Sequence, residues 1–278
     1  MASRIDSHHH LWTYDPEEFS WITPEMAAIR RDFLPADLEE QLAPARIDGT
    51  VVVQARQTVE ETEWLLGVAR SSDKVLGVVG WLPIASEYFE QHLERFAGAD
   101  LLKGLRHVVQ GEDAGFLDGT AFNKGISRLK PHGLVYDLLI YSGQMEEALR
   151  FVDRHPNQPF VLDHVGKPGI RRREVEPWKK WIGGLGKRPN VSCKVSGMVT
   201  EADWTNWNPA TLSPYFETVL EAFGAARLMV GTDWPVVTLG CSYSKWWEIV
   251  EEWVANLSEA EQAGILGENA ARIYRLKT

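Results

Sequence analysis

The sequence predicts an α/β protein, a single (β/α)8 TIM barrel that spans residues 1–278. About eight short apolar segments typical of buried strands recur along the chain, and each is followed by a helix or loop of the length found in βα units. Eight such repeats in roughly 250 residues suit a closed barrel better than an open sheet. No glycine-rich nucleotide or phosphate fingerprint follows the first strand, which weighs against the runner-up, a doubly wound open sheet.

The expected strands are apolar runs that end in polar residues. The first begins at Ile5, and the clearest covers 48–54 (DGTVVVQ), because its uninterrupted valines are typical of a strand buried on both faces. The remaining strands are expected over 75–82, 101–109, 133–140, 160–164, 191–195 and 228–233.

Helix signals alternate with these runs. Thr58 is expected to cap a helix over 60–70 that carries acidic residues in its first turn, and Ser258 with Glu261 forms a capping box at the start of a helix over 258–266. Residues 13–37 show no sustained period, so we expect a long loop with a short helix around 25–31. Other helices are expected over 87–96, 121–129, 144–154, 177–187, 214–223 and 243–254.

The composition of the chain limits the classes of function that it can have. The chain is 44% apolar and 24% charged, as in ordinary globular proteins, and its net charge of −10 with a pI near 5.3 weighs against a nucleic-acid partner. Cys193 and Cys241 lie far apart without a CxxC spacing, which fits a reducing compartment and gives no thiolate metal site. No signal peptide or membrane-spanning run is evident. We therefore expect a cytoplasmic protein, as a monomer or a homo-oligomer, without a membrane partner.

Candidate functional residues collect at the strand ends, where barrel enzymes carry their chemistry. In the stretch RIDSHHHLW, His8 and His10 are two residues apart on an expected strand, so both imidazoles face one centre. Strand interiors that end in polar groups are costly unless those groups share a cavity. The residues at these ends are His8, His10, Gln54, Arg56, Trp81, Arg106, His107, Asp137, Asp163, His164, Lys194 and Asp233.

Asp233 is the strongest catalytic candidate, because it ends a buried strand immediately before Trp234 and a proline. A desolvated carboxylate is expected to have a raised pKa and to act as a general base toward water. With His8, His10 and His164, it would also complete a nitrogen and oxygen set for a divalent cation.

Several of these residues also have a purely structural interpretation. Asp137 and Asp163 are suited to accepting hydrogen bonds, and Lys194 and Arg56 are suited to ion pairs. Cys193 is expected to pack as a small apolar side chain.

Three motifs carry a resemblance to a known family. They are IDSHHHLW (5–12), LDHVGKP (162–168) and GTDWPV (231–236), and weaker matching stretches occur in order along nearly the whole chain. The sequence resembles the amidohydrolase superfamily, specifically its sugar-acid lactonases of the L-fuconolactonase and L-rhamnonolactonase type.

The resemblance implies a (β/α)8 barrel with two histidines on the first strand, one on the sixth and an aspartate on the eighth. These positions fall on His8, His10, His164 and Asp233. The fourth strand offers Arg106 and His107 where similar enzymes with two metals carry a bridging lysine or glutamate. The resemblance thus favours one divalent cation, preferably zinc, or none, since related lactonases do not always require a metal.

The implied reaction is the hydrolysis of a small-molecule sugar lactone. Asp233 would take a proton from water and return it to the leaving ring oxygen, while a cation, or else His164, Arg106 or His107, stabilises the oxyanion. The residues expected to line the pocket and bind substrate hydroxyls are Trp12, Gln54, Arg56, Trp81, Asp137 and Trp234.

Three alternatives remain open on the sequence. One is a metal-dependent decarboxylase of the same superfamily. Another is a hydrolase of dicarboxylate or muconolactone-type lactones, in which Arg56, Arg106 and Lys167 would bind the additional anion. The third is a catalytically inactive barrel that only binds a sugar acid or a protein, against which the retained Asp233 argues.

Overall fold

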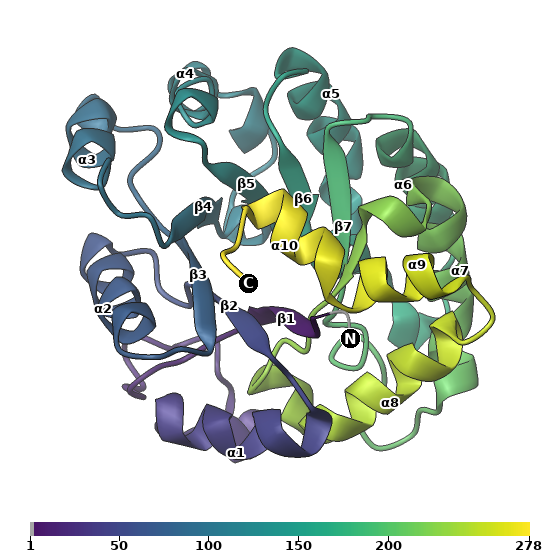
Figure 1. Ribbon diagram of the computed structural model, residues 1–278. Coiled ribbons are helices and arrows are strands. Elements are labelled where there is room, and N and C mark those ends of the chain that lie inside the picture. The colour runs from purple at the N-terminus through teal and green to yellow at the C-terminus, as the bar shows by residue number, and fades with distance from the viewer. Residues whose placement is uncertain (1–2) are drawn as a thin grey trace.

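The computed structural model describes residues 3–278 and has the predicted barrel architecture. Eight parallel strands form one sheet in sequential order, with each strand paired to the next one along the chain (Figure 1). The strands are β1 (Ile5–His9), β2 (Gly49–Val53), β3 (Val75–Gly80), β4 (Leu102–His107), β5 (Val135–Leu138), β6 (Phe160–Leu162), β7 (Val191–Val195) and β8 (Leu228–Val230). The prediction of a (β/α)8 barrel is therefore confirmed.

Backbone hydrogen bonds join the first strand to the segment after the last strand. The N–H of Asp233 donates to the carbonyl of His8 at 2.8 Å, and the N–H of His10 donates to the carbonyl of Trp234 at 2.6 Å. The residues expected to carry the chemistry are thus held together by the same backbone contacts that close the barrel.

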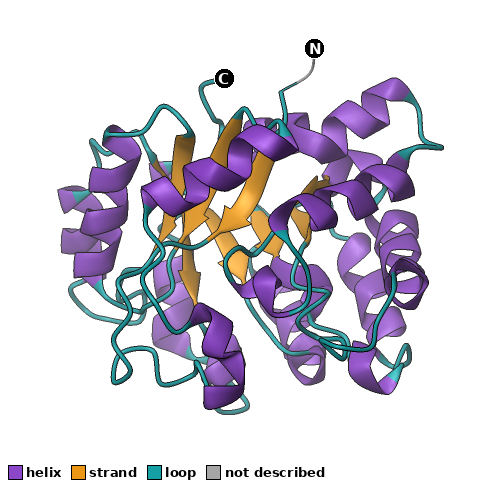
Figure 2. Cartoon of the chain, turned by 90° about the horizontal axis from the view of Figure 1, so that it is seen from below, coloured by secondary structure: helices purple, strands orange, loops and turns teal. Residues whose placement is uncertain are grey.

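Helices surround the sheet, and the strand arrows in Figure 2 point away from the end of the barrel where both termini lie. The helices are α1 (Pro35–Ala45), α2 (Val59–Arg70), α3 (Phe89–Arg95), α4 (Thr120–Ile126), α5 (Met145–Arg154), α6 (Trp178–Gly186), α7 (Pro209–Phe223), α8 (Tyr243–Val254), α9 (Glu259–Ala263) and α10 (Asn269–Tyr274). Thr58 caps α2, and Ser258 with Glu261 forms the capping box of α9, as predicted.

The sequence analysis did not find α1 or α10, and it began α7 five residues too late. Pro35 occupies the first turn of α1, and the Asp37 carboxylate accepts the N–H of Leu34, which are ordinary start signals that the apolar pattern alone did not reveal. In α7 the side chain of Asn208 accepts the N–H of Thr211 at 3.1 Å, so the helix begins at Pro209.

Two of the strands that end earlier than predicted are those expected to carry site residues. β6 ends at Leu162 rather than at His164, and β8 ends at Val230 rather than at Asp233. The cause is local backbone geometry, because His164 has φ 53° and Asp233 has φ 61°, values that cannot continue a strand. Both site residues therefore lie on turns just beyond their strands.

Part of the inside of the barrel is a separate apolar core. Helix α10 lies across the end of the barrel opposite the strand C-termini, where Figure 1 shows it over the centre of the sheet. Its Ala270 and Tyr274 pack against inward-facing residues of the strands. Those residues are Ile5, Val51, Val53, Val79, Val135, Val161 and Met229. The helix thus closes this end and leaves the opposite end for chemistry.

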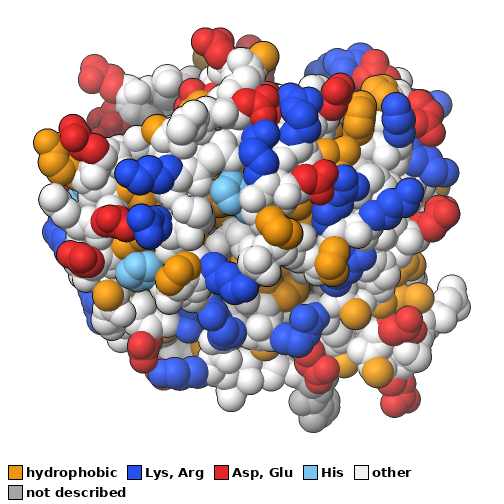
Figure 3. All heavy atoms as spheres, turned by 90° about the horizontal axis from the view of Figure 1, so that it is seen from above, with side chains coloured by type: hydrophobic (Ala, Val, Ile, Leu, Met, Phe, Trp, Pro, Cys, Tyr) orange, Lys and Arg blue, Asp and Glu red, His pale blue; other side chains and the backbone are white. Residues whose placement is uncertain are grey.

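The surface carries both signs of charge. On the face drawn in Figure 3, basic and acidic side chains are intermixed rather than gathered into one basic field. Among residues 3–278, no helix combines the length and the apolar character that crossing a bilayer requires.

Candidate active site

A cavity of about 330 Å³ opens at the C-terminal ends of the strands. Four residues that the sequence analysis named as site residues reach it, namely His10, Arg106, His164 and Asp233. The rest of its wall comes from the loops that follow the strands. Those residues are Trp21, Met26, Ala55, Val108, Gln110, Leu139, Tyr141, Lys167, Thr200, Glu201, Trp204, Val236 and Leu239.

His8, His10 and Asp233 form a tight buried cluster at the base of this cavity. The Nε2 atoms of His8 and His10 are 3.1 Å apart, and Asp233 Oδ1 lies 3.6 Å from the former and 3.2 Å from the latter. His9 points away from this cluster, with its Nε2 hydrogen bonded to Thr50 Oγ1 at 3.0 Å. This is the arrangement that the spacing of two residues on a strand predicts.

Hydrogen bonds fix which ring nitrogen of His10 faces the cluster. Its Nδ1 donates to the carbonyl of Val53 at 2.8 Å, which leaves Nε2 facing His8 and Asp233. His164 Nδ1 is hydrogen bonded to Ser196 Oγ at 2.9 Å, and its Nε2 lies 3.9 Å from Asp233 Oδ1. Converging imidazole nitrogens and a carboxylate oxygen are a donor set that suits a divalent cation.

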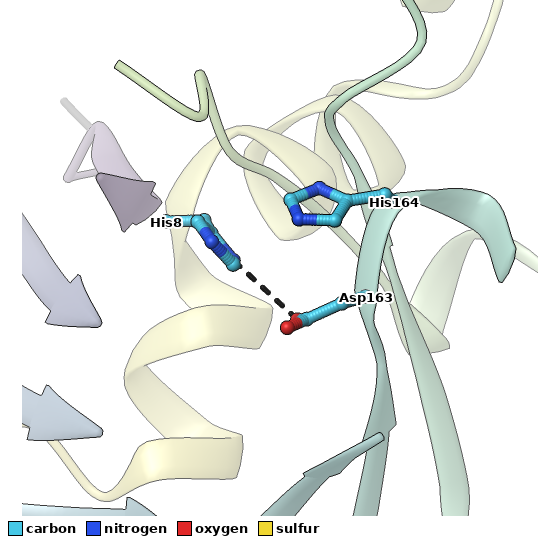
Figure 4. A group of neighbouring side chains, drawn as sticks. All are labelled: His8, Asp163 and His164. Carbon is cyan, nitrogen blue, oxygen red and sulfur yellow. Dashed lines mark ion pairs between the residues drawn. The ribbon is translucent and has the colours of Figure 1, made fainter. Parts of the chain in front are cut away.

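Asp163 forms an ion pair with His8 and comes from the same segment as its neighbour His164 (Figure 4). Its Oδ1 lies 3.4 Å from His8 Nδ1, within ion-pair distance of the imidazole ring. Arg106 Nη1 donates to Asp163 Oδ2 at 3.1 Å and also lies 3.3 Å from His8 Nε2. Asp163 therefore acts on the site through its neighbours, as the structural interpretation expected.

The pKa of Asp233 corrects one expectation. Burial by itself would raise the pKa, but nearby His164, His10 and Lys167 outweigh it, and the pKa lies below the ordinary value of 3.8. The expectation of a raised pKa is wrong because it considered desolvation without these partners. Burial lowers the pKa of His164 to about 4. At neutral pH the cluster therefore combines an ionised carboxylate with a neutral imidazole at His164.

A buried ion-pair network lies beneath the cluster. Lys194 Nζ donates to Asp137 Oδ2 at 2.5 Å and lies 3.1 Å from both Asp163 Oδ1 and His8 Nδ1. The hydroxyl of Tyr274 on α10 donates to both oxygens of Asp137, at 2.9 and 2.8 Å. Lys194 is thus the ion-pair partner that the sequence suggested, and Asp137 lies inside the barrel rather than on the cavity wall.

An unusual turn follows β6. The four consecutive residues 164–167 all have positive φ, from 47° to 71°, and one of them is the β-branched Val165. Each non-glycine residue in this conformation costs on the order of 1 kcal/mol or more, and such strain concentrates at functional sites. The turn brings both His164 and Lys167 to the cavity.

The remaining predicted residues lie outside the cavity wall. Arg56 pairs with Glu18 and Glu61, and His107 Nε2 bonds Glu112 Oε1 at 2.7 Å while its Nδ1 accepts the indole N–H of Trp81 at 3.2 Å. Three others are buried beside or behind the cluster. Gln54 bonds Arg106, Trp12 bonds the carbonyl of Arg31, and Trp234 packs against Phe33.

The sequence analysis gave no site role to most of the cavity wall. Trp21, Thr200, Glu201 and Trp204 reach the cavity from loop segments, whose conformation the sequence pattern does not specify. Lys167 was named only for the dicarboxylate alternative, although it belongs to the LDHVGKP motif next to His164. For Trp21 and Glu201, no local pattern signals that they reach the site.

Comparisons with known proteins match the chain to one family over nearly its full length. The amidohydrolase family model matches residues 5–276. The chain is 35% identical to an L-fucono-1,5-lactonase of Burkholderia multivorans, covering 99% of this chain and 97% of that protein, and 34% identical to one of Burkholderia ambifaria, with the same coverage. A crystal structure of a Burkholderia multivorans amidohydrolase with bound zinc superimposes with a TM-score of 0.94 at 35% identity, covering 99% of this chain and 100% of that one. With its barrel, its histidine pair on β1 and its aspartate after β8, the chain belongs to the amidohydrolase family.

Proposed function

We propose that the protein hydrolyses a neutral sugar-acid lactone, of the L-fucono- or L-rhamnono-lactone type, to the open-chain aldonate. Two full-length relatives are named L-fucono-1,5-lactonases, which supports the reaction class. The cavity supports the substrate class, because its wall contains polar side chains such as Gln110 and Thr200 together with indole and aliphatic groups.

The observation that carries this proposal is the charge balance of the cavity wall. A dicarboxylate lactone would need a free cation, and the three candidates were Arg56, Arg106 and Lys167. Arg56 is paired with Glu18 outside the cavity wall, and Arg106 donates to Asp163 and Gln54. Lys167 is paired with Glu201. A wall whose cations are all paired favours a neutral, hydroxylated ring over an anionic one.

In this proposal Asp233 moves the proton in both halves of the reaction. Its ionised carboxylate accepts a proton from a water that attacks the lactone carbonyl, and the protonated form then returns that proton to the ring oxygen as the C–O bond breaks. The lowered pKa of Asp233 makes its protonated form a strong donor to that oxygen. Arg106 and His164 lie beside Asp233 in the cavity wall, where N–H groups can stabilise the oxyanion.

A divalent cation fits the same cluster. His8, His10 and Asp233 would hold it, with His164 nearby, and it would supply Lewis-acid polarisation of the carbonyl. Zinc is the ion that these nitrogen and oxygen donors favour, and the relative of known structure binds zinc.

The test is lactone hydrolysis followed with a pH indicator. The panel contains L-fucono-, L-rhamnono-, D-galactono- and D-glucono-lactones and muconolactone, and each rate is corrected for spontaneous opening. We expect turnover of a deoxy-sugar lactone that Asp233→Asn reduces by about 10²-fold or more. Asp100→Asn, which removes an exposed carboxylate paired with Lys277, is the matched control and should retain the wild-type rate.

Two results would contradict the proposal. Hydrolysis of muconolactone without hydrolysis of the sugar lactones would support the dicarboxylate alternative. If no lactone is hydrolysed even with zinc supplied, lactone hydrolysis is rejected and decarboxylation is tested next. Repeating the assay after chelation shows whether the histidines act through a cation.

A further inference from the structure

We propose that Glu201 determines substrate specificity, because its carboxylate neutralises Lys167 in the cavity wall and so rejects lactones that carry a second carboxylate. The inference rests on the proposed lactonase function and deepens it by assigning a selecting residue. Specificity of this kind needs a repulsive element as well as attractive contacts.

The two residues come from neighbouring loops of the barrel. Lys167 ends the left-handed turn after β6, and Glu201 lies in the loop after β7. Their head groups are 3.6 Å apart, with 15% and 23% of the side-chain surface exposed, and both line the cavity that contains Asp233. They are therefore accessible to a ligand but largely screened from bulk solvent.

The head groups of Lys167 and Glu201 keep hydrogen-bonding positions that a ligand can use. Among residues 3–278, Lys167 and Glu201 have only each other as ion-pair partners, and a separation of 3.6 Å exceeds a normal hydrogen bond. An ammonium has three N–H donors and a carboxylate has about four acceptor positions. The pair can consequently bind the hydroxyl groups of a sugar ring from both sides while its net charge stays at zero.

The pair also lies within electrostatic reach of the proposed base. Lys167, Glu201 and Asp233 all line the same cavity of about 330 Å³. A lactone whose carbonyl is at Asp233 must therefore present another part of its ring to Lys167 and Glu201. A carboxylate there would meet the Glu201 carboxylate, whereas a hydroxyl would be accepted.

Loss of the Glu201 charge should reverse this selection. In Glu201→Gln, the amide keeps the side-chain shape and one acceptor, while the ammonium of Lys167 becomes free to bind an anion. The substrate pair for the test is L-fucono-lactone and galactaro-lactone, which carries a carboxylate in place of the methyl group. L-Galactono-lactone has a neutral hydroxymethyl group at that position, so comparing it with galactaro-lactone distinguishes an effect of charge from an effect of size.

The measurement is kcat/KM for the three lactones with wild-type protein and three variants. We expect wild type to prefer both neutral lactones, and Glu201→Gln to shift the ratio of galactaro- to L-galactono-lactone by about tenfold or more toward the anion. Glu201→Gln/Lys167→Met should abolish that gain. Glu248→Gln, which breaks an exposed pair with Lys245 on α8, is the matched control and should leave all ratios unchanged.

A gain of activity on a new substrate cannot arise from misfolding, so the Glu201→Gln result is interpretable even if the variant is less stable. The inference is overturned if wild type hydrolyses the anionic and neutral lactones equally, if Glu201→Gln leaves the ratio unchanged, or if the double variant keeps the gain. In those cases hydrolysis of L-fucono-lactone by wild type still upholds the proposed function. Silence of wild type on all three lactones rejects the proposed function and this inference together.

Discussion

Asp6 provides the sharpest test of how the barrel holds its active site. Its carboxylate is fully buried and accepts four hydrogen bonds, two of them from the backbone N–H groups of His8 and Thr232, at 3.0 and 2.9 Å. The hydroxyls of Thr232 and Tyr243 donate the other two, at 2.6 and 2.9 Å. One side chain thus ties together β1, the turn that carries Asp233, and α8.

The expected loss of stability in an Asp6 variant depends on which of the four hydrogen-bond donors can find another partner. In Asp6→Ala the two backbone N–H groups remain buried and unpaired at about 1–3 kcal/mol each, so the free energy of unfolding should fall by about 2–6 kcal/mol. In Asp6→Asn the amide oxygen can still accept both N–H groups, and the hydroxyls of Thr232 and Tyr243 can rotate to accept from the NH2 group. The Asn variant should therefore lose about 1 kcal/mol or less.

The pH dependence separates the two variants further. Burial raises the pKa of Asp6 to about 6 from 3.8, so the folded state binds more protons than the unfolded state between these values. Wild-type stability should consequently fall by about 3 kcal/mol as the pH rises through this window, and Asp6→Asn should lack that contribution. The stability of the Asn variant relative to wild type is therefore expected to increase between pH 4 and pH 8.

The assay is urea unfolding followed by tryptophan fluorescence, together with kcat/KM on the best lactone. Asp6→Ala should also lower kcat/KM by about 10²-fold, because His8 and the backbone next to Asp233 lose their common anchor. Equal losses of stability in the Ala and Asn variants, or a loss below 1 kcal/mol in Asp6→Ala, would refute the reasoning.

Three further predictions concern the buried network and the base. Lys194→Met should lower the free energy of unfolding by about 3–5 kcal/mol, and adding Asp137→Asn should recover part of it in urea unfolding. The pKa of Asp233 lies below 3.8 and that of His164 is about 4. The value of kcat/KM should therefore stay level from pH 8 to pH 5 and decline only in more acidic solution, where Asp233 becomes protonated. A pH profile with a midpoint near 6 would contradict this prediction. Tyr274→Phe should cost about 1–3 kcal/mol by thermal melting, because Asp137 loses its hydroxyl donor.

The sequence was sufficient to predict the fold and the meeting of His8, His10, His164 and Asp233 for one physical reason. The strands of a parallel barrel end at a common face, so polar residues at the ends of apolar runs must meet. The histidine pair on β1, His164 after β6 and Asp233 after β8 followed from position along the chain alone. The structure brings these residues within hydrogen-bonding or ion-pair distance of one another.

The cavity wall could not be predicted in the same way. None of the six residues expected to bind substrate lines it, because their side chains bond within the barrel, pack behind the cluster or pair with neighbouring helices and loops. The wall depends on loop conformations such as the left-handed turn at 164–167, and single-residue patterns carry no information about such turns. The pKa of Asp233 was mispredicted for a related reason, since it depends on groups that only the fold brings together.

The position of Tyr274 has a consequence for the order of folding. Its hydroxyl bonds both oxygens of Asp137, although 137 residues separate the two positions in the sequence. Ala270 and Tyr274 of the same helix also cover the apolar residues inside the barrel. The inner strand residues can therefore be buried only after α10 has docked, and a variant truncated before α10 should bind chaperones and be cleaved by proteases more readily than the protein that carries this helix.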